Sequence, residues 1–174
     1  MWSDRPRRLF HVSDIAGIER FAPRPGGAGD PAVWAIEERL LPNYLLPRDC
    51  PRVTFYATPE SEPRDVVRFL AGATHVVAVE ESWVDRIATA RLYLYEMPQA
   101  PFRLTDAIAG YYTANEVVEP LSVVSLESPV FAIGSRGSAL RVLPGLWELH
   151  DQIAASSLAF SMIRMRNASP RQES

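Results

Sequence analysis

The chain contains one cysteine, Cys50, so no disulfide can form within it. It also lacks any apolar run approaching the roughly 18 residues that a membrane-spanning helix needs. No apolar segment follows the arginines near the N-terminus, and we therefore expect no signal peptide and no membrane partner. A single thiol fits a reducing compartment, so the expected location is the cytoplasm.

An excess of positive charge is also absent. The formal net charge of −3 argues against nucleic acid as a partner, although Arg5, Arg7 and Arg8 leave room for a local basic patch. The segment 26–29 is rich in glycine, but no lysine follows it and no strand-to-helix context surrounds it, so it is not a phosphate-binding loop.

The sequence contains few residues that could bind a metal or act as a thiol nucleophile. The three histidines, His11, His75 and His150, lack the spacing of metal ligands, and the sequence predicts no metal site. Cys50 with one of these histidines would make a nucleophile pair, but a buried thiol inside the core is the favoured interpretation.

What remains is the composition of an ordinary globular protein. Hydrophobic residues make up 47% of the 174 residues, which is enough for one domain with a substantial core. We predict a single α+β domain over residues 8–167, with frayed termini at 1–7 and 168–174 because both ends are polar.

Hydrophobic patterning predicts many short strands and one clear amphipathic helix. The expected sheet is mostly antiparallel. The interruption of the run 117–126 by Pro120 indicates an edge strand or a bulge. The helix is predicted over 145–166, where Leu149, Ile153 and Phe160 recur at helical spacing and should be buried. Strands are expected at 9–12, 32–37, 52–57, 75–79, 91–97, 102–104 and 117–126, with shorter helices at 38–46, 61–72 and 82–88.

Two short segments carry the most specific information. Leu9-Phe10-His11-Val12-Ser13 predicts a strand with one inward polar residue. The segment 110–120, Gly-Tyr-Tyr-Thr-Ala-Asn-Glu-Val-Val-Glu-Pro, predicts an aromatic turn that brings Glu116 to the start of a strand. The prolines of Pro47-Arg48-Asp49-Cys50-Pro51 predict an ordered loop with Cys50 facing the interior.

These segments, together with Val33-Trp34-Ala35-Ile36, resemble a bacterial family of small single-domain proteins that has no established activity. The residues are scattered over 9–126, and the run Pro-Arg-Asp-Cys-Pro-Arg at 47–52 is the most specific of them. This resemblance implies a relative without implying a reaction.

A more distant resemblance suggests a function. The order of His11, then Trp34 or Tyr44, then Glu116 resembles the histidine, aromatic, glutamate order of ADP-ribosyltransferase-like domains. The resemblance implies that His11 hydrogen-bonds the nicotinamide ribose and that Glu116 holds its 2′-hydroxyl. It also implies that Tyr44, supported by Trp34 or Tyr112, packs against the nicotinamide ring.

The chain departs from that pattern in two places. Ala114 stands where some branches carry a second glutamate, and the segment 34–36 lacks their Ser-Thr-Ser sequence. NAD, as a substrate, is the expected small-molecule partner. A fixed carboxylate such as Glu116 stabilises the positive charge that develops on the ribose when the glycosidic bond breaks.

Each candidate also has a purely structural interpretation. His11 is equally consistent with a satisfied core histidine, and Trp34 with a core aromatic. Because neighbouring residues of a strand face opposite sides, only one residue of the Tyr111-Tyr112 pair can line a cleft.

Charged candidates also have alternatives. Glu119 is a rival carboxylate for Glu116, although Pro120 favours a solvated position for it. Arg48 either binds phosphate or forms an ion pair with Asp49.

We therefore expect an ADP-ribosyltransferase-like protein in which His11, Tyr44, Tyr112 and Glu116 line one cleft for NAD or a related nucleotide. The acceptor and the oligomeric state are not predicted. The alternative is a non-catalytic ligand-binding or interaction module with the same fold.

Overall fold

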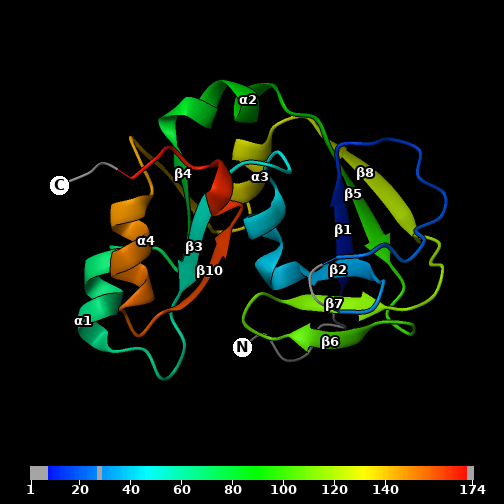
Figure 1. The fold of residues 1–174 in the computed structure, drawn as a ribbon, viewed down its shortest axis with the longest axis horizontal. Helices are drawn as coiled ribbons and strands as arrows, with labels where there is room; N and C mark the ends of the chain where they lie inside the picture. Colours follow the sequence, from blue (N-terminus) through cyan, green and yellow to red (C-terminus); the bar gives the residue numbers. More distant parts are fainter. Residues whose placement is uncertain (1–7, 27–28, 172–174) are drawn as a thin grey trace. The chain divides into compact units, whose positions relative to one another are not determined.

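The computed structural model describes residues 8–26 and 29–171, and the chain forms two compact units. The first unit comprises the residues up to Tyr44 together with Arg91–Leu126, and the second comprises Leu45–Ala90 together with the residues from Glu127 onward. The second unit is therefore built from two segments that flank 91–126. In Figure 1 the blue strands of the first unit lie beside its green and yellow strands, which come much later in the sequence.

The first unit is an antiparallel sheet of six short strands in the order β6-β7-β2-β1-β5-β8. A 3-10 helix, Glu38–Tyr44, follows β2. Strand β1 pairs with β5 over five residues, but with β2 only at Leu9 and Phe10. The strands are β1 (Leu9–Ser13), β2 (Val33–Glu37), β5 (Leu92–Met97), β6 (Arg103–Asp106), β7 (Tyr111–Ala114) and β8 (Ser122–Leu126).

One face of this sheet forms the core of the first unit. Alternate residues of each strand point to the same face, so Leu9, Ala35, Tyr95 and Tyr112 gather there. Phe21 closes this core, because its backbone pairs with Val118 in both directions at 2.8 and 2.9 Å.

The second unit contains a four-stranded sheet in the order β10-β3-β4-β9. Its pairings are antiparallel except that between β4 and β9. The strands are β3 (Arg52–Tyr56), β4 (His75–Glu80), β9 (Ala139–Leu143) and β10 (Ala159–Ile163). The helices are α1 (Pro63–Asp65), continued by a π-turn at Val66–Leu70, α2 (Val84–Thr89) after a 3-10 turn at Glu81–Trp83, α3 (Pro129–Gly134) and α4 (Trp147–Ala154), with a last 3-10 turn at Met165–Asn167.

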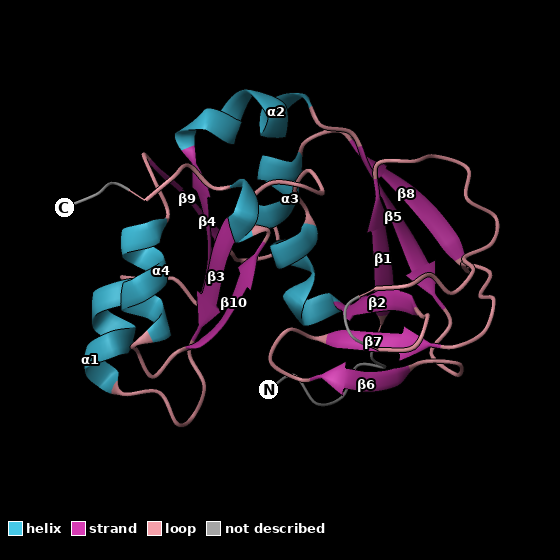
Figure 2. Ribbon diagram, in the orientation of Figure 1, coloured by secondary structure: helices cyan, strands magenta, loops and turns pink. Residues whose placement is uncertain are grey.

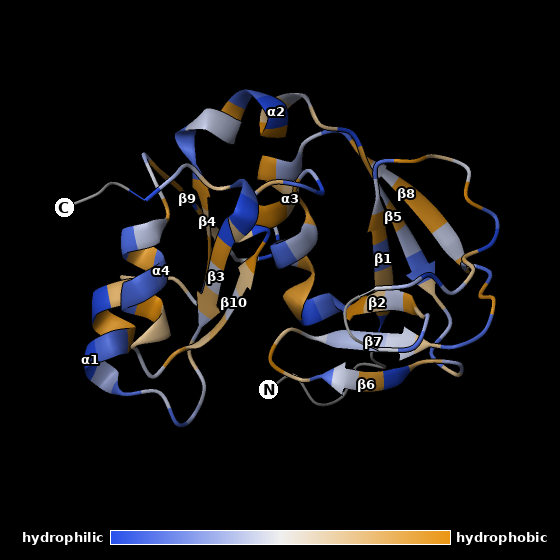
Figure 3. Ribbon diagram, in the orientation of Figure 1, coloured by the Kyte–Doolittle hydropathy of each residue, from blue (hydrophilic) through white to orange (hydrophobic). Residues whose placement is uncertain are grey.

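Helices α1 and α4 lie on the same side of this sheet (Figure 2). Phe69, Leu146 and Ile153 from the helical side pack against Phe55 and Val76 of the strands. The side chains of Phe55, Val76, Leu146 and Ile153 are fully buried, and Figure 3 shows the apolar colouring of the strands beneath these helices.

The predicted helix over 145–166 is wrong in its second half. Helix α4 ends at Ala154, and Phe160 lies on strand β10 opposite Phe55. The helix stops where Ser156 Oγ donates a hydrogen bond to the carbonyl of Ile153, an end-of-helix carbonyl. Ile153 is buried as predicted, but Leu149 and Phe160 are only half-buried. Phe160 is half-buried because β10 is the last strand of its sheet.

The predicted fold class is otherwise confirmed at its coarser level, an α+β protein with mostly antiparallel sheets. Two sheets stand in place of the one expected. The single domain over 8–167 stays a prediction. The expected frayed segments 1–7 and 172–174 lie outside the described residues, whereas Ser169 donates hydrogen bonds to the carboxylate of Glu80. No helix in the described part of the chain is long and apolar enough to cross a membrane.

Candidate functional site

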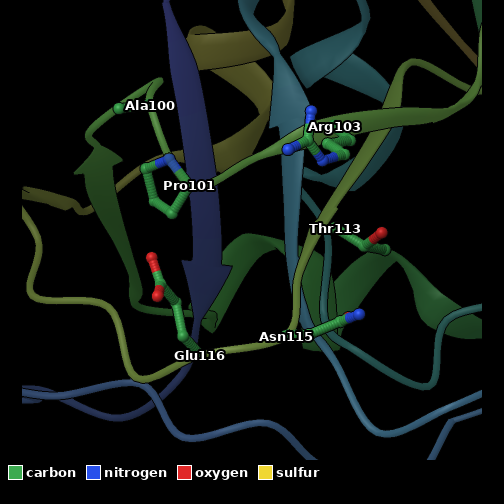
Figure 4. Close-up of a pocket in the computed structure, with 6 residues that line it drawn as sticks. All are labelled: Ala100, Pro101, Arg103, Thr113, Asn115 and Glu116. Carbon is green, nitrogen blue, oxygen red and sulfur yellow. The ribbon is translucent and has the colours of Figure 1, made fainter.

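The first unit contains a hollow of about 380 Å³ that is lined by Glu116 and polar neighbours. Its lining includes Arg103 of β6, Thr113 of β7 and Asn115 of the turn that follows β7. The side chain of Glu116 extends toward Pro101 (Figure 4). Figure 4 also shows Ala100 beside Pro101 at the rim. The hollow thus presents one carboxylate, one guanidinium, one hydroxyl and one amide.

Glu116 differs from the rival carboxylate Glu119 in its surroundings. Both glutamates are exposed, but Glu119 pairs with Arg20 at 3.0 Å, which is the solvated arrangement expected from the sequence. Within residues 8–26 and 29–171, neither Glu116 nor Arg103 has an ion pair through its side chain. Both charges of the hollow are therefore available to a ligand.

A second hollow, of about 580 Å³, lies between α1 and α4 in the other unit. Its two aspartates already have partners. Asp65 accepts hydrogen bonds from the backbone N–H and hydroxyl of Ser157, and Asp151 pairs with Arg171. These bonds hold the pKa of both carboxyls below the ordinary range. This hollow therefore offers less uncommitted charge than the one around Glu116.

His11 lies on β1, on the core face of the sheet, where its ring is 4.6 Å from that of Phe21. Its Nδ1 is 2.8 Å from the carbonyl oxygen of Trp34 on β2. A carbonyl only accepts, so Nδ1 carries the proton and donates it. The bond joins β1 to β2 just beyond the two residues at which their backbones pair, and it fixes the orientation of the imidazole ring.

The segment that carries Glu116 is connected to His11 through Phe21. Val118, two residues after Glu116, forms two backbone hydrogen bonds with Phe21. Phe21 in turn packs against the His11 ring. His11 and Glu116 thus belong to neighbouring segments of one unit. Of the predicted site residues, Glu116 lines the hollow and His11 does not.

The aromatic residues form a cluster around Tyr111, not Tyr112. The Tyr111 ring lies 5.2 Å from Trp34 and 5.3 Å from Tyr44. Tyr112 lies opposite Ala35 and is buried in the core. The alternation of β7 therefore gives Tyr112 a packing role and leaves its neighbour to join Trp34 and Tyr44.

The proline-rich segment belongs to the second unit. Arg48 is exposed there, and its carbonyl accepts a hydrogen bond from Arg52 at 3.5 Å. Cys50 is fully buried, as predicted, and burial raises the pKa of its thiol to about 11. The thiol is therefore protonated at neutral pH and is a poor nucleophile.

Sequence reasoning missed the polar lining residues Arg103, Thr113 and Asn115. Arg103 and Thr113 occupy paired positions on β6 and β7, and both strands are only four residues long. The sequence carries no local signal that would single out Arg103, since β6 reads Arg-Leu-Thr-Asp. Among the described residues, no group of three or more histidine, cysteine, aspartate or glutamate side chains gathers as a metal site would require.

Comparison with known proteins bears on the family. A model described as a family of unknown function, DUF6886, matches residues 10–168. No curated protein and no solved structure matches the chain. The match spans both units, and it agrees with the resemblance to a family without an established activity that the motifs at 9–13, 33–36 and 47–52 indicated. The chain belongs to this family, DUF6886.

Proposed function

We propose that the protein binds NAD or a related nucleotide in the hollow around Glu116 and acts on it as an ADP-ribosyltransferase-like enzyme. The observation that carries the proposal is a carboxylate and a guanidinium that face one hollow, neither of them in an ion pair among the described residues. A volume of about 380 Å³ lies at the small end of ligand pockets and suits half of a dinucleotide better than the whole.

The two charged side chains of the hollow contact different parts of the ligand. Arg103 binds a phosphate oxygen through charge-assisted hydrogen bonds. Glu116 faces the ribose. When the bond between C1′ and the nicotinamide nitrogen breaks, nicotinamide leaves with the electron pair and positive charge develops on the ribose, where the Glu116 carboxylate stabilises it. A nucleophile then forms the new bond at C1′ and loses its proton.

His11 suits a positioning role in this scheme. Its Nδ1–H is held by the carbonyl of Trp34, so the tautomer and the ring plane are set before a ligand arrives. The resemblance assigns to this residue a hydrogen bond with the nicotinamide ribose. Trp34, Tyr44 and Tyr111 form an aromatic cluster on the face of the sheet opposite His11 and do not line the hollow, so this scheme gives them no contact with the ligand.

The proposal is tested by ligand-dependent stability and by nicotinamide release. NAD and ADP-ribose should raise the melting temperature, because a ligand that binds only the folded state stabilises it by mass action. Glu116→Gln should abolish nicotinamide release and leave NAD affinity nearly unchanged, because the carboxylate matters most once charge develops. Glu119→Gln is the matched control and should retain turnover. A release rate unchanged in Glu116→Gln would contradict the proposed role.

The second candidate is a binding module without catalysis on the same scaffold. It is favoured because two residues predicted to contact the ligand, His11 and Tyr112, pack within the fold. His11 packs on Phe21 and joins β1 to β2, and Tyr112 fills the core. In this version NAD or ADP-ribose stabilises the protein, no nicotinamide is released, and Glu116→Gln weakens ligand binding modestly.

A further inference from the structure

Strand β8 forms one edge of the six-stranded sheet and exposes apolar side chains. It is the last strand in the order, paired with β5 alone. Val123 and Val124 are 51% and 54% exposed, and Leu121 just before the strand is 67% exposed. Figure 3 shows β8 as hydrophobic over most of its length. An edge strand leaves alternate N–H and C=O groups unpaired, so such a surface can accept another strand.

The opposite edge of the same sheet is protected, and the contrast is informative. Strand β6 begins with Arg103 and ends with Asp106, and its pairing with β7 shifts register between Leu104 and Asp106. Charges and irregular pairing are the usual means of blocking edge-to-edge association. Strand β8 has no charged residue and pairs with β5 in unbroken register over all five residues. The edge at β8 therefore lacks the features that keep strands apart.

We propose that β8 pairs with β8 of a second copy of this chain, antiparallel and about a two-fold axis, to form one continuous sheet. Residues directly opposite in a sheet share a face, and a two-fold axis between antiparallel strands preserves the face. The axis must therefore pass midway between one residue and the same residue of the second copy. The middle residue of the five-residue strand is Val124, and only this centre lets all five residues pair.

Charge supports this register over its neighbour. With Val124 on the axis, Val123 lies opposite Ser125 and Ser122 lies opposite Leu126 of the second copy. A centre on Val123 would instead place Glu119 opposite Glu127, and like charges directly opposite destabilise a sheet. The uncharged strand is complementary to itself and offers no charge to attract a charged peptide. A five-residue strand buries little area, so the dimer is expected to be weak.

The test is the oligomeric state of the full chain by sedimentation equilibrium, from micromolar to near-millimolar concentration. Val124→Lys places two lysines opposite each other at the axis and should raise the dimer dissociation constant at least tenfold. Leu104→Lys on β6 is the matched control, because Leu104 is also 54% exposed, and it should leave the dimer unchanged. Val124→Thr keeps the side-chain shape without charge and should retain the dimer.

A second measurement reads the register directly. Val124→Cys places a thiol opposite its own copy, within reach of a disulfide, and mild oxidation should give a covalent dimer. Leu104→Cys should not cross-link, and the native thiol of Cys50 is fully buried. A wild-type chain that stays monomeric throughout, or a dimer that Val124→Lys leaves intact, would overturn the proposal and leave the edge to another partner.

Discussion

Gly110→Ala should destabilise the first unit more than a change at any other left-handed glycine of that unit. Gly110 has φ of +70° and immediately precedes β7, which carries Tyr111. A Cβ there would lie 2.9 Å from Leu40 Cδ1, closer than real Cβ atoms approach, and 3.0 Å from Glu37 Cγ, which is also an unusually tight contact. The left-handed backbone costs alanine about 1–2 kcal/mol, and the overpacking adds about 1–3 kcal/mol. We therefore expect a loss of about 2–5 kcal/mol in the free energy of unfolding.

Gly17→Ala separates the two contributions. Gly17 has φ of +69° in the same unit, but no atom lies within 4 Å of its Cβ position. It should lose only the backbone contribution, about 1–2 kcal/mol. Urea unfolding followed by circular dichroism measures both variants against the wild type. If Gly110→Ala and Gly17→Ala cost the same within about 0.5 kcal/mol, the close approach of Gly110 to Leu40 does not constrain the fold.

The remaining predictions concern the second unit. Burial raises the pKa of the Cys50 thiol from about 9 to about 11, so at pH 8 it should react with a thiol reagent about a hundredfold more slowly than an exposed cysteine, even before restricted access of the reagent is counted; rapid native-state labelling would contradict this. Asp65→Asn should lower stability at neutral pH, because the hydrogen bonds from Ser157 hold the folded pKa of Asp65 below its ordinary value. The stabilisation by this carboxylate is present above the ordinary aspartate pKa and is lost as the pH falls through the folded pKa. The difference in stability between wild type and Asp65→Asn should therefore shrink in acid. Ile153→Ala should cost about 2–5 kcal/mol in urea unfolding, and Phe160→Ala less than the roughly 3–5 kcal/mol of a fully buried phenylalanine; a Phe160→Ala loss within that range would contradict the half-buried edge position.

Local patterns predicted the elements wherever one periodicity dominated a segment. The strands around His11 and His75, and the edge position of the strand after Pro120, are found in the structure. The pattern failed after Ala154, where Phe160 continues the helical spacing by chance. Residues 159–163 alternate as well as they repeat at helical spacing, and only pairing with β3 decides between the two.

The candidate site was predicted in part for the same physical reason. Of the residues chosen from chain order, Glu116 lines the hollow, whereas Trp34 and Tyr44 cluster with Tyr111 outside it, and their part in a site stays a prediction. The choice between Tyr111 and Tyr112 was not accessible from chain order, because it depends on the register of β7 against β2. Arg103 was missed because its place in the same hollow as Glu116 results from the pairing of β6 with β7, a tertiary contact that no local pattern encodes.

The most direct test of the nucleotide-binding claim is a calorimetric titration of NAD into three proteins. Wild type should show saturable binding, and Arg20→Ala should match it, because Arg20 pairs with Glu119 on the exposed surface. Arg103→Ala should bind at least tenfold more weakly, since a hydrogen bond to a charged phosphate contributes about 1.5–3 kcal/mol. Absence of binding to wild type, or equal affinity of wild type and Arg103→Ala, would contradict the account.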